Sequence, residues 1–137
     1  MKVLKIKLVI FNLLLVIGLF VSCEENDKTE YKSYIIQIDS VEVSNNVVAN
    51  IPVDIYFYGT VGTDGCYKFS HFKTDKLNNE ILVECSGKQN VTSGACPTVM
   101  VYLNGEKLSY LFEETGNYLI RIKQPDNSFL EKEIIVE

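Results

Sequence analysis

Apolar and polar residues alternate with a period of two along most of the chain after its first 32 residues. In 51–58 every second residue is apolar, from Ile51 to Phe57. This alternation is typical of antiparallel strands with one buried face, and helical periodicity is weak throughout. The expected strands span residues 34–43, 51–58, 66–74, 81–85, 99–103, 107–112, 118–122 and 129–136.

Turn signals separate these segments. Asn104-Gly105 is the strongest hairpin signal, because a type I′ turn needs positive φ at both central residues. We expect loops at 59–65, 87–95 and 113–117, a turn at 125–128, and a bulge near Asp39-Ser40, where the apolar parity changes. Short strands separated by turns predict an all-β, antiparallel β-sandwich of seven to eight strands.

One motif refines this prediction. Gly116-Asn117-Tyr118 precedes the penultimate strand and resembles the tyrosine corner of immunoglobulin-like sandwiches. In that corner the tyrosine hydroxyl bonds to backbone a few residues upstream. The resemblance implies an immunoglobulin-like fold, and the alternative is that Tyr118 is an ordinary core aromatic.

The first 22 residues differ from the rest. Lys2, Lys5 and Lys7 precede an apolar run over 8–21, which is too short for a comfortable membrane-spanning helix. This arrangement predicts a secretory signal peptide. Val21-Ser22-Cys23 resembles the bacterial lipobox, which implies removal of 1–22 and acylation of Cys23. An uncleaved anchor with an incidental cysteine is the alternative.

The segment after Cys23 is acidic and polar, and we expect residues 23–32 to form a tether and 33–137 the sandwich domain. Glu24-Glu25-Asn26-Asp27 resembles the surface-export signal of Bacteroidetes-type lipoproteins. The resemblance implies an outer-membrane, lipid-anchored protein displayed on the cell surface. An ordinary solvated tether is the alternative.

Charge limits the range of partners. Without the three leader lysines the chain has 10 basic and 18 acidic residues, a net charge of −8. An acidic domain repels nucleic acid and anionic headgroups, and the sequence contains no basic stripe. We therefore expect no nucleic-acid partner and a membrane attachment through the lipid alone.

Three cysteines remain after Cys23 is acylated, so three pairings exist. Cys85 shares its parity with Ile81 and Val83, which predicts a buried thiol. Cys66 and Cys96 each lie where a loop meets a strand, and an oxidising compartment favours a disulfide between them. Gly65-Cys66-Tyr67-Lys68-Phe69, together with a cysteine about thirty residues on, also resembles small bacterial lipoproteins with an immunoglobulin-like domain of unassigned function.

The sequence contains few candidates for catalysis. C-x-x-C, G-x-S-x-G and zinc-ligand spacings are absent. The single histidine, His71, lies on the Tyr67/Phe69 parity of its strand, where a packed or surface role is the usual one. We expect no catalytic, metal or cofactor site, and no enzyme activity.

Two features favour binding or modification. Tyr56 and Tyr58 lie on the outward parity of their strand, where exposed tyrosines can stack on sugars or anchor a protein partner. Packing under another layer is the alternative. Asp39-Ser40-Val41 resembles a Bacteroidetes-type O-glycosylation site at Ser40. The favoured function is a non-enzymatic envelope module that binds a protein or glycan, and the alternative is an immunoglobulin-like inhibitor of secreted proteases.

Overall fold

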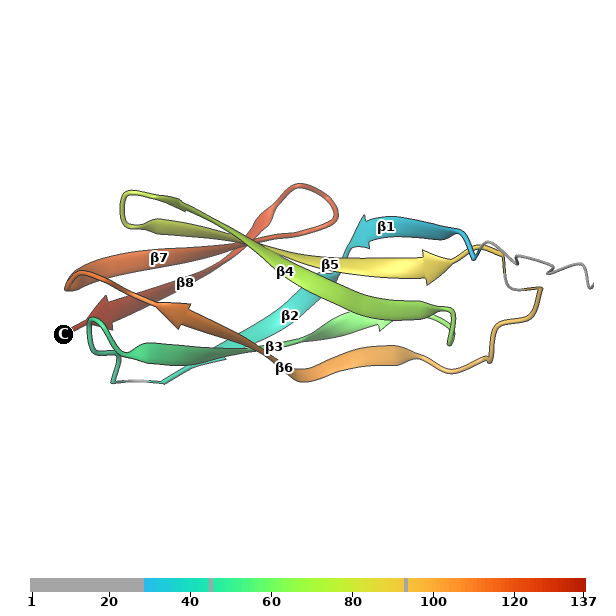
Figure 1. Ribbon diagram of the computed structural model, residues 1–137, viewed down its shortest axis with the longest axis horizontal. Coiled ribbons are helices and arrows are strands. Elements are labelled where there is room, and N and C mark those ends of the chain that lie inside the picture. The colour runs from blue at the N-terminus through green and yellow to red at the C-terminus, as the bar shows by residue number, and fades with distance from the viewer. Residues whose placement is uncertain (1–28, 45, 93) are drawn as a thin grey trace, which may run out of the picture.

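The computed structural model describes residues 29–44, 46–92 and 94–137, and these residues form eight strands in two sheets (Figure 1). This confirms the predicted all-β sandwich. None of these residues forms a helix long and apolar enough to span a membrane. Cys23 and the residues on either side of it, through 28, lie outside the described part. The strands are β1 Tyr31–Ile35, β2 Gln37–Val43, β3 Pro52–Gly62, β4 Tyr67–Leu77, β5 Glu80–Asn90, β6 Val101–Leu111, β7 Gly116–Lys123 and β8 Phe129–Val136.

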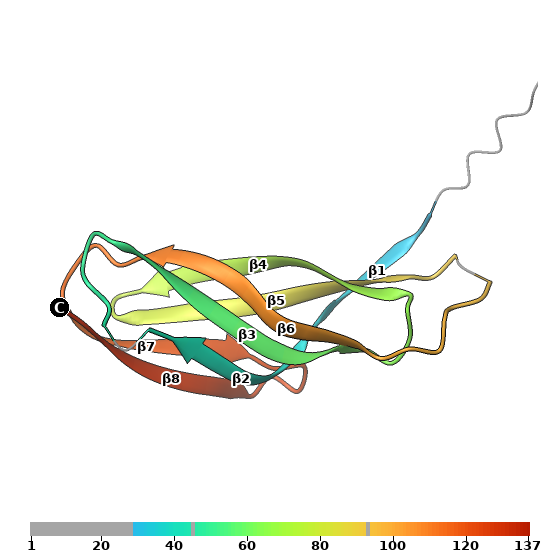
Figure 2. The same cartoon turned by 90° about the horizontal axis from the view of Figure 1, so that it is seen from below.

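The larger sheet contains β1, β4, β5, β7 and β8, and the smaller sheet has the order β2-β3-β6 (Figure 2). β5 is central in the larger sheet: β4 pairs with one edge of it, and β1 and β7 with the other. The β5–β7 pair is parallel, with Ile81 opposite Ile120, which corrects the prediction of an antiparallel sandwich. β5 and β7 are connected through β6 in the other sheet, so no tight hairpin sets their relative direction.

The first predicted strand is divided between the sheets. β1 pairs with β5, and β2 pairs with β3 after a break at Ile36. The register shifts between Ile38 and Ser40, which confirms the predicted bulge. β1 begins at Tyr31, two residues before the predicted start of the domain.

The core lies between the sheets and comes from alternating positions. Val53, Ile55 and Phe57 of β3 are buried, as predicted, whereas Ile51 is 57% exposed because it lies before the strand. Ile81, Val83 and Cys85 of β5 are fully buried. Buried Gln124 joins the sheets at one edge, since its Oε1 accepts a bond from the Ile38 amide at 3.1 Å.

Two predicted connections are strand instead. Asn104-Gly105 is not a hairpin: β6 continues through it, and the register against β3 shifts between Phe57 and Tyr58. Gly105 has a φ of 81°, so the sequence correctly indicates a positive φ at this residue. The residue belongs to a β-bulge, however, and not to a hairpin turn. β3 likewise continues through Gly59 to Gly62, because β6 pairs with it over that length.

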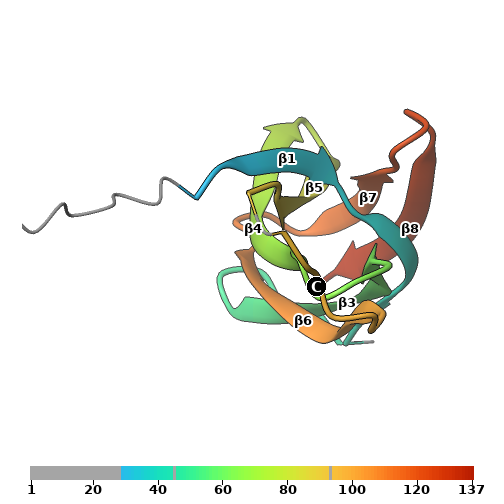
Figure 3. The same ribbon diagram turned by 90° about the vertical axis from the view of Figure 1, so that its right-hand side faces the viewer.

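The two ends of the sandwich differ. The described chain begins at the end that carries the 91–100 loop, and the C-terminus lies at the opposite end (Figures 1 and 3). Tyr31 pairs with Asn90 at one end of β5, and Glu80 begins β5 at the other. β5 has 11 residues, which separates the two ends by about 33 Å. We call them the tether end and the distal end.

Candidate functional site

The cysteines adopt the predicted arrangement. Cys66 and Cys96 form a disulfide with a Cα–Cα distance of 5.4 Å, and Cys85 is free and buried. The Asp64 carboxylate lies beside the two sulfurs. Because both sulfurs belong to a disulfide, neither is a thiolate able to bind metal. Asp64 instead accepts a bond from the Cys66 amide at 2.9 Å.

Cys85 is chemically quiet. Burial, with a smaller effect from the neighbouring Glu84 charge, raises the pKa of its thiol to about 12. The thiol therefore stays protonated at neutral pH, and a protonated thiol is a poor nucleophile. This environment favours a packing role over redox chemistry.

His71 does not share a face with Tyr67 and Phe69, so that prediction is wrong. The register of β4 against β5 shifts between Phe69 and His71, and this bulge reverses the parity. Phe72 turns inward instead, with its ring centroid 4.8 Å from that of Phe57. His71 is exposed, and the hydrogen-bond partner that the structure gives its Nδ1 is Ser70, at 3.2 Å.

The outer face of the smaller sheet carries the two predicted tyrosines. Tyr56 is 38% exposed, and Tyr58 is half-buried with its hydroxyl donating to Glu42 Oε2 at 3.2 Å. Partial desolvation and the Glu42 carboxylate raise the pKa of Tyr58. Exposed Ser40 pairs directly with Tyr58. The predicted O-glycan site and tyrosines therefore lie on one face.

Sequence reasoning missed a third tyrosine of this face. Tyr102 pairs with Thr60 on the outward parity and is 58% exposed. Val101 and Leu103 share the inward parity of the expected strand 99–103, and their alternation with Tyr102 is the signal that places this tyrosine on the outward face. Its position next to β3 depends on the β3–β6 pairing, which the predicted hairpin at Asn104-Gly105 obscured.

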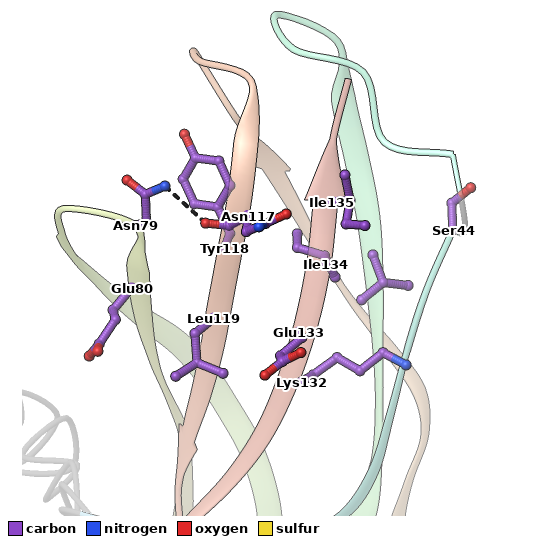
Figure 4. A pocket seen from close by; sticks show the side chains of 11 residues that line it. Ser44, Asn79, Glu80, Asn117, Tyr118, Leu119, Lys132, Glu133, Ile134 and Ile135 are labelled. Carbon is purple, nitrogen blue, oxygen red and sulfur yellow. Dashed lines mark hydrogen bonds between the residues drawn. The ribbon is translucent and has the colours of Figure 1, made fainter.

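A groove of about 690 Å³ lies at the distal end (Figure 4). Four separate segments contribute to it, and we call it the distal groove. Its lining residues are Val43, Ser44, Asn79, Glu80, Asn117, Tyr118, Leu119, Lys132, Glu133, Ile134 and Ile135. No local sequence signal marks it, because its parts meet only when β5, β7, β8 and the end of β2 come together.

The pairing of β5, β7 and β8 determines which side chains are neighbours in the distal groove. Leu119 of β7 lies between Glu80 of β5 and Glu133 of β8, so an apolar side chain is flanked by two carboxylates. Arg121 pairs with Glu80 at 3.6 Å. Ile135 adds an apolar surface that is 66% exposed. Apolar contacts beside carboxylates suit the binding of a peptide or glycan.

The rim of the distal groove at Asn79 and Asn117 is polar and ordered. The Asn79 amide donates to the Asn117 carbonyl at 2.9 Å, which joins the β4–β5 turn to the start of β7. The Leu119 amide also donates to the Asn79 carbonyl at 2.9 Å. These bonds fix the rim, so a ligand would meet a preformed surface.

Comparison with protein-family models, curated proteins and solved structures gave no match for this chain.

Proposed function

We propose that the protein is a non-enzymatic binding module of the outer membrane, anchored through acylated Cys23, that presents its distal groove to a protein or glycan. The observation that carries the proposal is the opposition of the two ends. The chain enters the sandwich at Tyr31, and the groove lies about 33 Å away at the other end of β5. An anchor at one end leaves the other free for a partner.

The chemistry of the distal groove supports binding. Leu119 and Ile135 offer apolar contact, and Glu133 and Asn117 offer hydrogen-bonding groups at its rim. A preformed site with a few convergent polar groups is the usual form of a ligand site.

The anchor is tested by mass spectrometry of the mature protein. We expect an N-terminal peptide that begins with acylated Cys23, and membrane release of the protein on Cys23→Ser substitution. A mature chain that begins elsewhere contradicts the anchor. Loss of the domain when intact cells meet an external protease would support display on the outer surface.

The groove is tested by capture of partners from outer-membrane extract. We expect Ile135→Glu to reduce capture of a specific envelope partner at least tenfold, because it places a charge in the apolar part of the groove. Tyr102→Ala, on the outer face of the smaller sheet, is the control. Loss of capture with Tyr102→Ala but not with Ile135→Glu would place the binding site on the outer face of the smaller sheet. Capture of a secreted protease would favour the inhibitor function.

A further inference from the structure

Three neighbouring strands bring two lysines around one tyrosine at the tether end. Lys68 of β4 lies directly opposite Lys88 of β5, and β1 places Tyr31 beside them. The Lys68 and Lys88 Nζ atoms lie 4.7 Å and 5.4 Å from the centroid of the Tyr31 ring. Lys68 Nζ also donates to the Tyr31 hydroxyl at 3.4 Å. The sequence, with its acidic balance, gave no sign of this basic cluster.

These two lysines lack the carboxylate partners that three other bases of the larger sheet have. Lys73, Arg121 and Lys123 each form an ion pair within 3.7 Å. Across the described residues, no ion pair involves Lys68 or Lys88. Like charges directly opposite each other destabilise a sheet, and the contacts of both lysines with the Tyr31 ring act against that repulsion. An external anion would complete the cluster.

Exposed apolar residues lie at the same end. The Val91 amide donates to the Glu30 carbonyl at 3.0 Å, which places Val91 beside Tyr31. Val91, Val99 and Met100 are 46%, 54% and 48% exposed in and beside the loop at the tether end. Tyrosine, lysine and small apolar groups together are typical of surfaces at a membrane interface.

The acids at this end are few. Glu30 is exposed, and the Asp64 carboxylate is turned toward the Cys66 amide. These two acids equal Lys68 and Lys88 in number, so the positive charge is local to the two lysines around Tyr31, in a domain whose net charge is strongly negative.

We propose that Tyr31, Lys68, Lys88, Val91, Val99 and Met100, which we call the tether-end patch, rest on the bilayer, with both lysines on lipid phosphates. The proposal rests on the acyl anchor at Cys23, which lies eight residues before Tyr31 and so within about 28 Å of it. Each lysine favours the bound orientation on an anionic bilayer by roughly fivefold. This contact holds the distal groove away from the membrane.

The test uses the acylated full-length mature protein in nanodiscs. One set contains phosphatidylcholine alone, and the other contains phosphatidylcholine with phosphatidylglycerol. An amine-acylating reagent is added, and peptide mass spectrometry follows each lysine. We expect Lys68 and Lys88 to react at least fivefold more slowly on the anionic discs at low salt, with protection lost at high salt. Lys107 and Lys132 should react equally on both.

A second measurement compares variants of equal charge. Hydrogen exchange of the 91–100 loop should slow on anionic discs for wild type and for K73Q/K107Q. It should not slow for K68Q/K88Q. This comparison separates the patch from a general effect of net charge.

Two results would overturn the patch. Equal reactivity of Lys68 and Lys88 on both discs shows that they do not contact lipid. Protection on both discs that disappears after E24Q/E25Q/D27N substitution shows that the acidic tether occupies the cluster instead. The mass of the N-terminal peptide, measured before reconstitution, tests the anchor separately. A chain without acyl groups contradicts both the anchor and the tether-end patch. An acylated chain whose Lys68 and Lys88 are not protected contradicts the patch alone.

Discussion

Tyr118 links the start of β7 to the loop before it through one hydroxyl. Its ring packs against Phe112, with centroids 4.9 Å apart, and its hydroxyl donates to the Glu114 carbonyl at 3.1 Å. This bond is the one expected of a tyrosine corner, so the motif-based prediction is confirmed.

Removing that hydroxyl should have a modest cost. We expect Tyr118→Phe to lower the free energy of unfolding by about 1 kcal/mol, because the ring keeps its packing while the Glu114 carbonyl loses its donor. Urea unfolding measures the change. Tyr56→Phe is the control, since no bond of the Tyr56 hydroxyl is found within the described chain, and it should leave the midpoint unchanged.

Because of Cys85, the free energy of unfolding depends on pH in the alkaline range. The pKa of its thiol is about 12 in the folded protein, against an ordinary value of 9.0. Below pH 9 both states carry the proton, and the full stability is present. Between pH 9 and 12 only the folded state keeps it, so the free energy of unfolding falls by about 1.4 kcal/mol per pH unit.

Comparison of the wild-type protein with Cys85→Ala isolates the contribution of Cys85 to this pH dependence of the free energy of unfolding. Tyr34 also titrates late, because burial and the neighbouring Tyr67 raise its pKa to about 12, but that contribution is common to both proteins. The difference in free energy of unfolding between wild type and Cys85→Ala should shrink from pH 9 upward. A constant difference would contradict a buried, protonated thiol.

Gly105 shows how one residue shapes a strand. Its φ of 81° is strained for any side chain, so we expect Gly105→Ala to lower the free energy of unfolding by about 1 kcal/mol or more. Gly94→Ala is the matched control, because an added Cβ there meets nothing within 4 Å. Thermal unfolding of the two variants measures the difference, and equal midpoints would contradict the strain.

At the scale of strands, sequence predicted which face of a strand is buried better than where the strand ends. The inward residues of β3, β5 and β7 follow from alternation alone. The ends do not, because pairing with a neighbour outweighs local turn preference. β3 and β6 pair along most of their 11 residues each, so Gly59 and the Asn104-Gly105 step are held inside strands. His71 is misplaced because a bulge precedes it, and in the sequence that bulge is marked only by the change of apolar parity from Phe69 to Phe72.

The outer edge of β8, which pairs with Val47 only at Val136, has an unusual inward residue. Lys132 lies opposite Ile120, a fully buried residue, so its side chain starts from the core face (Figure 4). Inward-pointing charges on edge strands prevent pairing with another chain, because a docked strand would bury the ammonium.

Replacing this charge should promote self-association. We expect Lys132→Val to form dimers or larger species at concentrations where the wild type is monomeric, as measured by size-exclusion chromatography with light scattering. Lys132→Arg retains the inward charge and should stay monomeric. A monomeric Lys132→Val variant would show that β8 is protected in another way.

For the molecule as a whole, the sandwich was predictable but its surfaces were not. Alternation and turns imply two packed sheets, whatever the order of the strands. The distal groove requires Glu80, Leu119 and Glu133 to be neighbours, which follows from a parallel β5–β7 pair that no local pattern indicates. The tether-end patch depends in the same way on β1 and β4 flanking β5.

The disulfide stabilises the whole domain. Cys66 and Cys96 are separated by 30 residues, so we expect Cys66→Ser with Cys96→Ser to lower the free energy of unfolding by about 3–4 kcal/mol. Denaturant unfolding measures it, and reduction of the wild-type protein should give a similar loss. An unchanged midpoint would show that the loop it closes is already ordered in the unfolded chain.

With the proposed anchor at Cys23, the short strand β1 would determine how the protein bears mechanical load. Its five residues run antiparallel to β5, and the chain leaves at Tyr31 along the direction of the strand. A ligand pulled at the distal end against an anchor at the tether end would therefore shear all the β1–β5 hydrogen bonds together instead of opening them one at a time. A force that exceeded their strength would free β1 first, and the Ile36 amide, bonded to the Cys85 carbonyl at 2.8 Å, would be the next to resist. Releasing β1 would lengthen the tether while β2 and the core remained folded.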